Sequence, residues 1–165
     1  MSKTKSHSKW PPEMIISGGQ TGVDRAGLDW AIQNGVVHGG WCPKGRLATD
    51  GPLPPRYHLR ETESSGYRQR TKRNVQDSEA TLIFNLGELD GGTLQTARFA
   101  VALKRPNYVF QLEQTKTAAV EDMVCWWQAL RVRSLNIAGP REEKRPGIYQ
   151  ATLSILAAAM LLEVQ

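Results

Sequence analysis

A short apolar strand that runs into a glycine-rich loop and then into an amphipathic helix constrains the fold of this chain more than any other feature. The strand covers residues 14–17, and the helix begins at Asp24. The loop between them consists of Gly18, Gly19, Gln20, Thr21 and Gly22. Small residues let backbone N–H groups approach a ligand, and a helix N-terminus carries unpaired N–H donors with about half a positive charge. The segment therefore predicts an anion site at the start of this helix.

Four further apolar runs predict strands, and helical patterns separate them. The predicted strands cover residues 14–17, 36–41, 80–85, 107–111 and 134–138. The predicted helices cover residues 24–34, 67–77, 93–103, 118–131 and 146–163. Strands that alternate with helices are typical of a parallel sheet that is covered on both faces. We therefore expect an α/β fold of the doubly wound class, with a mostly parallel sheet of about five or more strands.

Length and composition predict a single domain over residues 14–165. Of the 165 residues, 40% are hydrophobic and 22% are charged, which is typical of globular proteins. Residues 1–13 are rich in Ser and Lys and are expected to form a disordered lead, without the apolar core of a secretory signal. No apolar run approaches the roughly 20 residues that a membrane span needs. Residues 43–66, rich in Pro, Gly and charge, are interpreted as a functional loop or lid.

Charge and metal-ligating residues narrow the classes of function. The formal net charge is +5, and a cluster of Lys and Arg lies between residues 56 and 73. This cluster is either a solvated face or an attraction for an anion, and without interleaved aromatic residues it does not favour nucleic acid. Two distant cysteines favour a reducing cytoplasm, and the histidines lack the spacing of metal ligands. We therefore expect a cytoplasmic protein with no side-chain metal site, no nucleic-acid partner and no membrane association.

Two more loops are expected to meet the first one at the carboxyl edge of the sheet. Right-handed crossovers place successive loops at that edge, where ligands of doubly wound folds bind. The second loop, residues 87–96, offers the candidate binding residues Gly91, Gly92, Thr93 and Thr96. The third loop, residues 138–142, offers Gly139 and Arg141. Glycine and threonine also serve plain turns and caps, but two such loops in one domain favour a shared ligand.

Several charged residues near these loops have two interpretations each. Asp24, a candidate binding residue, either caps the first helix, which is favoured, or has a catalytic role. Arg25 either clamps a phosphate or pairs with Asp29 one turn later. Lys44, Gly45 and Arg46 follow the second predicted strand, where the two cations would add charge-assisted contacts to an oxyanion.

Five motifs, taken together and in this order, resemble those of the molybdenum carrier or molybdenum cofactor carrier proteins. They lie at residues 18–25, 39–46, 67–75, 91–96 and 136–142, and the resemblance runs from about residue 14 to residue 162. That family is in turn similar to the SLOG superfamily of Rossmann-like folds, which includes lysine-decarboxylase-like nucleotide-binding proteins and cytokinin-activating phosphoribohydrolases.

The resemblance implies a Rossmann-like homo-oligomer, a dimer or a tetramer, that binds, protects and delivers the molybdenum cofactor without changing it. This cofactor is a pterin, molybdopterin, with a terminal phosphate and an oxo-molybdenum group, and its recipients would be molybdoenzymes or cofactor-synthesis proteins. The phosphate would lie at the first helix, with the metal-oxo end toward Lys44, Arg46 and the second loop. The residues that would supplement the first two loops are Lys44, Arg46, Arg70, Thr71, Asn74 and Arg141.

Other ligands and activities remain open from the sequence. Charge alone would let the same cleft take molybdate, tungstate or polyoxometalate clusters. The hydrolase relatives carry a glutamate shortly after their second loop, whereas this chain has Thr93-Leu94-Gln95-Thr96 there. No catalytic residue is therefore predicted, although Asp24, Glu88 and Asp90 are candidate substitutes. The alternatives to a carrier are a nucleotide-monophosphate phosphoribohydrolase and a sensor of a nucleotide derivative.

Overall fold

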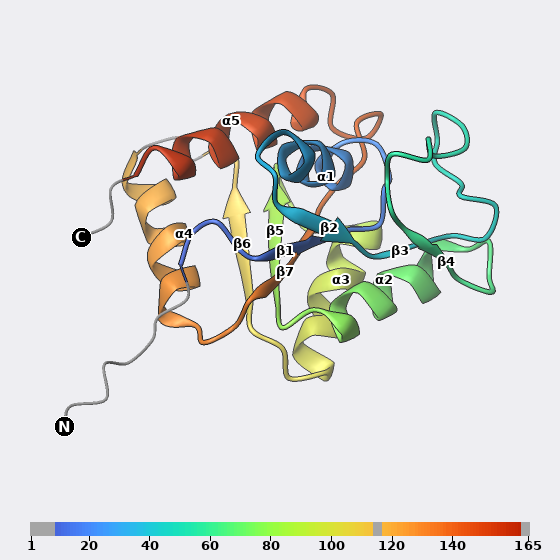
Figure 1. The fold of residues 1–165 in the computed structure, drawn as a ribbon, viewed down its shortest axis with the longest axis horizontal. Helices are drawn as coiled ribbons and strands as arrows, with labels where there is room; N and C mark the ends of the chain where they lie inside the picture. Colours follow the sequence, from blue (N-terminus) through green and yellow to red (C-terminus); the bar gives the residue numbers. More distant parts are fainter. Residues whose placement is uncertain (1–8, 114–116, 163–165) are drawn as a thin grey trace.

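A five-stranded parallel sheet forms the centre of the protein (Figure 1). Its strands, in spatial order, are β2 (Val37–Gly39), β1 (Met14–Ile16), β7 (Ser134–Ala138), β5 (Ala80–Asn85) and β6 (Asn107–Gln111). Every neighbouring pair runs parallel. The computed structural model describes residues 9–113 and 117–162. The α/β fold class predicted from the sequence is confirmed.

The last strand of the chain occupies the middle of the sheet. If the five strands are renumbered in chain order, the spatial order reads 2-1-5-3-4. This is the doubly wound order 3-2-1-4-5 with the first strand moved to the end of the chain. The chain passes from β1 outward to β2 and from β5 outward to β6, toward opposite edges of the sheet. The topological switch point, where such folds bind ligands, therefore lies at the carboxyl end of β7.

Helices cover both faces of the sheet (Figure 1). On one face α1 (Val23–Gln33) and α4 (Thr117–Ala129) both pack against α5 (Ile148–Met160). On the other face α2 (Tyr67–Asp77) packs against α3 (Gly91–Ala102). All six residues of β5 are buried, as expected for a strand with helices above and below it. The main hydrophobic core packs β1, β5, β6 and β7 against α1, α4 and α5.

The segment predicted to be a lid is folded onto α1. It is joined to the domain by a second, two-stranded parallel sheet of β3 (Trp41–Cys42) and β4 (Arg60–Glu61). Arg46 organises its interior, because this one guanidinium donates hydrogen bonds to four backbone carbonyls. A small core then joins α1 to the segment through Leu28, Cys42, Leu53, Tyr57 and Leu59.

The observed helices begin and end within three residues of the predicted bounds, apart from the C-terminal end of the last one, where Glu163 lies outside the described residues. The predicted N-terminal lead differs more. Its residues 1–8 also lie outside the described residues, but Lys9 O accepts a hydrogen bond from Trp127 Nε1, and the Trp10 ring lies 5.8 Å from that of Trp30. Within the described part of the chain, no helix is both long and apolar enough to span a membrane.

Candidate anion-binding site

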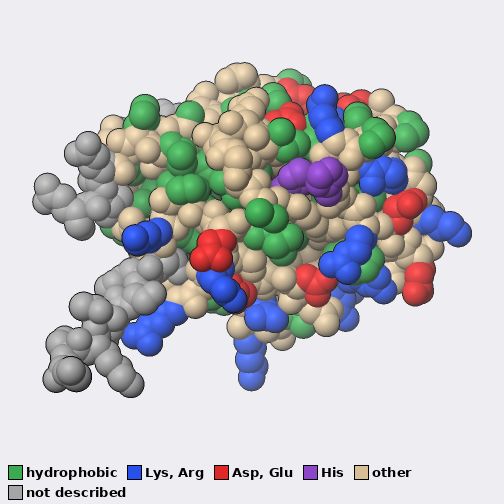
Figure 2. Space-filling view, viewed as in Figure 1, with side chains coloured by type: hydrophobic (Ala, Val, Ile, Leu, Met, Phe, Trp, Pro, Cys, Tyr) green, Lys and Arg blue, Asp and Glu red, His purple; other side chains and the backbone are tan. Residues whose placement is uncertain are grey.

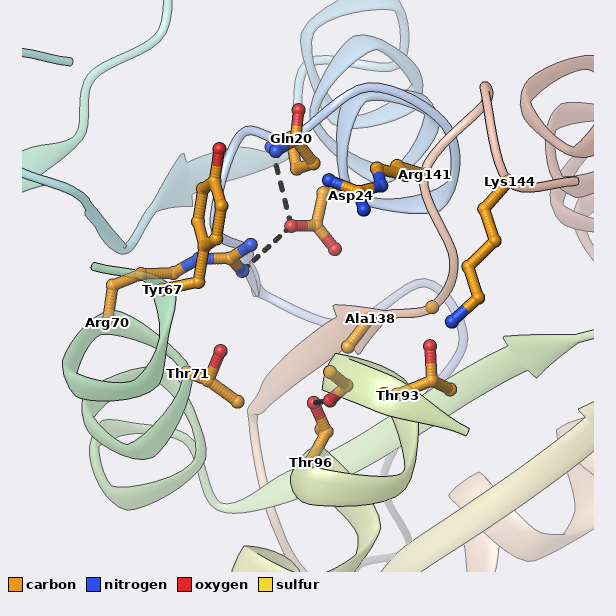
Figure 3. A pocket seen from close by; sticks show the side chains of 13 residues that line it. Gln20, Asp24, Tyr67, Arg70, Thr71, Thr93, Thr96, Ala138, Arg141 and Lys144 are labelled. Carbon is orange, nitrogen blue, oxygen red and sulfur yellow. Dashed lines mark hydrogen bonds and ion pairs between the residues drawn. The ribbon is translucent and has the colours of Figure 1, made fainter. Parts of the chain in front are cut away.

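A cavity of about 190 Å³ lies at the carboxyl end of β7, at the topological switch point (Figure 3). The first loop and α1 contribute Gln20 and Asp24, and the segment after β7 contributes Gly139, Arg141 and Lys144. The remaining lining residues are Tyr67, Arg70 and Thr71 of α2, Gly91, Gly92, Thr93 and Thr96 of α3, and Ala138 at the end of β7. The three loops predicted to share a ligand, residues 18–22, 87–96 and 138–142, thus all contribute to this cavity.

The N-terminus of α3 opens into this cavity with its backbone donors free. Asp90 at the N-cap makes no side-chain capping bond, and the first bond of the helix runs from Leu94 N to Asp90 O. Within the described part of the chain, the N–H groups of Gly91, Gly92 and Thr93 have no hydrogen-bond acceptor. A Cβ added to Gly92 would meet nothing within 4 Å. Three free donors at a helix N-terminus form a cradle for an anion.

The N-terminus of α1 is instead filled by the protein itself. Val23 N donates to Pro140 O, and Thr21 N donates to the side-chain oxygen of Gln20. Gly22 has φ +85°, and a Cβ there would lie 2.4 Å from Pro140 O. Glycine is therefore needed at Gly22 for contact with another segment of the chain, and the predicted phosphate site at this helix finds its donors largely occupied.

A buried ion pair lies on the α1 side of the cavity. Asp24 is 3% exposed, and its Oδ2 accepts hydrogen bonds from Arg70 Nη1 at 3.0 Å and from Gln20 N at 3.4 Å. Burial raises the pKa of the Asp24 carboxyl, although the nearby Arg70 opposes this shift. A Cβ on Gly18 would lie 2.0 Å from Arg70 Nη1, so glycine leaves the space that the guanidinium fills. Asp24 thus lines the cavity and does not cap α1.

Two cations of the segment after β7, Arg141 and Lys144, line the cavity, and Lys144 lies at its α3 side beside Asp90. The Arg141 residue is exposed, and its guanidinium makes no hydrogen bond or ion pair with any described residue. Lys144 Nζ lies 2.6 Å from Asp90 Oδ1, and Arg145 lies 3.5 Å from the other oxygen of that carboxylate. The hydrogen bond from Lys144 lowers the pKa of Asp90. Lys144 and Arg145 therefore neutralise Asp90 at the N-cap of α3. The Arg141 guanidinium, unpaired among the described residues, is available to a ligand.

Several residues predicted to bind the ligand lie elsewhere and hold the lid segment in place. Arg25 does not pair with Asp29 but forms an ion pair with Asp50 at 2.9 Å, and it also donates to Gly19 O. Asn74 holds the backbone of Trp41 through both its amide nitrogen and its carbonyl oxygen. Lys44, Gly45 and Arg46 also lie outside the lining, as do Gly18, Gly19, Thr21 and Gly22.

The sequence reasoning missed Tyr67 and Lys144 as lining residues. Tyr67 begins the motif at residues 67–75 but is not among the predicted binding residues, and Lys144 lies outside the five motifs. Tyr67 reaches the cavity through the packing of α2, and Lys144 reaches it through the course of the segment after β7. The alternation of strands and helices could have placed the start of α2 and the segment after β7 at the same edge of the sheet. The choice of side chain, however, depends on tertiary packing.

The basic cluster between residues 56 and 73 is used largely in contacts with aromatic rings. The guanidiniums of Arg60 and Arg73 lie 4.8 and 4.6 Å from the ring centre of Trp41, and Arg68 lies 4.9 Å from that of Phe99. On the face seen in Figure 2, Lys and Arg side chains alternate with acidic ones and form no continuous basic surface. Most of these Lys and Arg side chains thus belong to a solvated face, where guanidiniums pack over aromatic rings.

A second cavity of about 410 Å³ lies on the other side of the first loop and is lined by Thr21, Arg25, Asp29, Tyr57 and Tyr149, among others. The two tyrosine hydroxyls each donate to the Asp29 carboxylate at 2.6 Å. The Thr21 hydroxyl donates to the Glu143 carboxylate at 2.8 Å. Because these polar groups are paired with one another, the second cavity has few spare donors for a ligand. Among the described residues, no group of three or more His, Cys, Asp or Glu side chains could hold a metal ion.

Comparison with known proteins identifies relatives of this chain. The model of the circularly permutated YpsA SLOG family matches residues 15–160. The crystal structure of a protein named "Putative molybdenum carrier protein", from Syntrophus aciditrophicus SB, is 42% identical in sequence. The alignment covers 96% of this chain and 99% of that one, with a TM-score of 0.88. No curated protein matches the chain. These findings confirm the resemblance that the five motifs indicate, and the central place of β7 agrees with a circular permutation.

Proposed function

Because the chain belongs to the circularly permutated YpsA SLOG family, we propose that it is a carrier that binds the molybdenum cofactor in the cavity at the end of β7. A relative that is 42% identical carries the name of a molybdenum carrier. The observation that carries the proposal is the open N-terminus of α3, where three N–H donors without an acceptor among the described residues face the cavity that Arg141 also lines. This set of groups suits a phosphate.

The phosphate of the cofactor lies, in this proposal, at Gly91, Gly92 and Thr93 and not at the first helix. Lys144 supplies positive charge at the α3 side, Arg141 supplies it from the lining of the same cavity, and the Thr93 hydroxyl is a further donor. The sequence alone favours the first helix, because the loop of small residues before it can bring backbone N–H groups up to a ligand. The free donors at α3 are the reason for moving the phosphate to the second loop.

The size of the cavity supports partial enclosure of the cargo. Sites that enclose a whole drug-sized ligand measure about 300–1,000 Å³, and this cavity measures about 190 Å³. The phosphate and the group next to it fit inside, while the rest of a pterin cofactor extends beyond the cavity. A partly exposed cargo is accessible to a recipient protein, as delivery requires. A homo-oligomer in the cytoplasm that serves molybdoenzymes or cofactor-synthesis proteins remains the prediction for its cellular context.

A phosphoribohydrolase is the second candidate, and one observation favours it. Asp24 is a buried carboxyl with a raised pKa that lines the cavity, and such a group can act as a general acid or base. Glu88 is exposed and does not line the cavity, and Asp90 is held by Lys144 and Arg145. Incubation with AMP separates the two candidates, because a hydrolase releases free adenine and a carrier leaves AMP intact.

Titration with the isolated molybdenum cofactor tests the proposal. We expect saturable binding near one cofactor per subunit, with AMP and molybdate as weaker competitors. Molybdate and tungstate share the charge of the phosphate, so they are expected to occupy the same donors at higher concentration. Tight binding of AMP together with no binding of the cofactor would contradict the carrier function and favour the nucleotide-binding alternatives.

A further inference from the structure

The cavity contains one acidic group opposite its anion cradle. Asp24 uses Oδ2 for Arg70 and Gln20, whereas Oδ1 accepts no hydrogen bond from any described residue. Figure 3 shows this second oxygen directed into the cavity, across from Thr93 and Lys144. The cavity therefore presents donors at the α3 side and a free acceptor at the α1 side.

A bare oxyanion and an organic phosphate respond differently to this arrangement. A bare oxyanion such as molybdate has only acceptor oxygens to offer, and the Asp24 carboxylate repels it in a site where little water screens the charges. An organic phosphate with an N–H or O–H group nearby can rest its phosphate on α3 and donate that group to Asp24 Oδ1. Arg70 cannot turn fully to an anion, because that would leave a buried carboxylate without its partner.

We propose that Asp24 determines the class of ligand, favouring phosphates that carry an N–H or O–H donor next to the anionic group over bare oxyanions. The inference rests on the proposed function of the cavity, and it names the chemistry that the site selects. It also explains why a cavity for an anion contains a buried carboxylate that serves no cap and no catalytic pair.

Binding of a bare oxyanion is expected to be coupled to protonation of the Asp24 carboxylate. The charged groups around this carboxyl are Arg70 from α2, Arg25 from α1, and Arg141 and Lys144 from the segment after β7. Burial already favours the protonated form of Asp24, and an arriving oxyanion favours it further. Binding of molybdate is therefore expected to take up a proton, whereas a ligand that donates to Oδ1 leaves Asp24 ionised.

The test compares wild type with Asp24→Asn in calorimetric titrations near neutral pH, with molybdate and with the isolated molybdenum cofactor as probes. We expect Asp24→Asn to tighten molybdate binding about tenfold, because it removes the repelling charge. We expect it to weaken cofactor binding about tenfold, because a neutral amide replaces the charged acceptor of the ligand's hydrogen bond. Asp29→Asn is the matched control, since Asp29 lies on the same helix but in the second cavity, and it should leave both affinities unchanged.

Proton uptake is the measurement that does not depend on a variant. Titration of wild type with molybdate in two buffers of different ionisation enthalpy should reveal uptake of a proton, and the cofactor should reveal none. Unchanged or weaker molybdate binding in a folded Asp24→Asn variant, or no proton uptake by wild type, would overturn the role of Asp24. Failure of wild type to bind the cofactor, with the molybdate results as expected, would overturn the carrier function and leave the selection against bare oxyanions standing.

Discussion

The N-termini of α1 and α3 both follow a buried strand and both begin beside glycines, yet they meet different partners. At α1 the N–H groups of Thr21 and Val23 are used by the protein, and Gly22 contacts the backbone of Pro140. At α3 the first backbone donors have no acceptor in the part of the chain that the structure describes, and Gly92 faces open space. A glycine after a strand thus indicates that something approaches closely, and only the tertiary structure shows whether it is a ligand or another part of the chain.

The largest expected effect comes from Gly22→Ala. This glycine has φ +85°, and a Cβ would lie 2.4 Å from a backbone oxygen that cannot move aside easily. We expect the free energy of unfolding to fall by about 2–4 kcal/mol. Urea unfolding measures the change. An alanine variant as stable as wild type would mean that the α1 loop is not packed as described and could still admit a ligand.

Gly92→Ala should have the opposite profile. A methyl group there meets no protein atom within 4 Å, and alanine favours the helix over glycine. We therefore expect stability within about 1 kcal/mol of wild type, together with an affinity for the cofactor that falls about tenfold, because the methyl group occupies the anion cradle. Urea unfolding and the cofactor titration measure the two quantities. If affinity is unchanged while the protein stays folded, the anion does not bind at α3.

Arg141→Ala and Arg25→Ala form a matched pair of arginine deletions. The Arg141 guanidinium lines the cavity and has no partner among residues 9–113 and 117–162, so its loss should weaken cofactor binding about fivefold to tenfold. Arg25 is held by Asp50 and Gly19 outside the cavity, so its loss should leave affinity unchanged. Titration of both variants decides between the helices, because a larger loss from Arg25→Ala would return the phosphate to α1.

The smallest expected effect is a difference in pKa between Asp24 at the start of α1 and Asp90 at the start of α3. Burial raises the pKa of Asp24 above its ordinary value of 3.8, whereas Lys144 lowers that of Asp90. The contribution of Asp24 to stability is therefore present below pH 3.8 and lost as the pH rises through its folded pKa. The contribution of Asp90 is present above pH 3.8 and lost as the pH falls through its folded pKa.

NMR titration of the side-chain carboxyl carbons measures the two pKa values directly. We expect Asp24 to titrate at a higher pH than Asp90. The reverse order would mean that Asp24 is not buried against α2. The starts of α1 and α3 would then not differ in the environment of their acidic residues as described.

The sequence predicted the layered fold well because strands and helices have different hydrophobic periods. The run from residue 80 to residue 85 is mainly apolar, and it forms the buried strand β5. The helix predicted over residues 67–77 has the bounds observed for α2. The packing of Trp10 on the core was missed, since two prolines beside a polar segment resemble a disordered lead.

The candidate site was only partly accessible from the sequence. The three loops could be placed at one edge, because parallel strands with right-handed crossovers bring their carboxyl ends together. The roles of single arginines could not be assigned, because a guanidinium can donate to a phosphate, a carboxylate or a carbonyl oxygen. Arg46 binds carbonyls, Arg25 binds a carboxylate, and Arg141 remains unpaired among the described residues.

The most direct test of the central claim follows the backbone amides of both helix starts by NMR while the isolated cofactor is added. The claim predicts large, saturable shifts for Gly91, Gly92 and Thr93, with little change at Thr21 and Val23, whose donors the protein already uses. Shifts centred on Thr21 and Val23, with α3 unaffected, would contradict it and place the anion at the first loop.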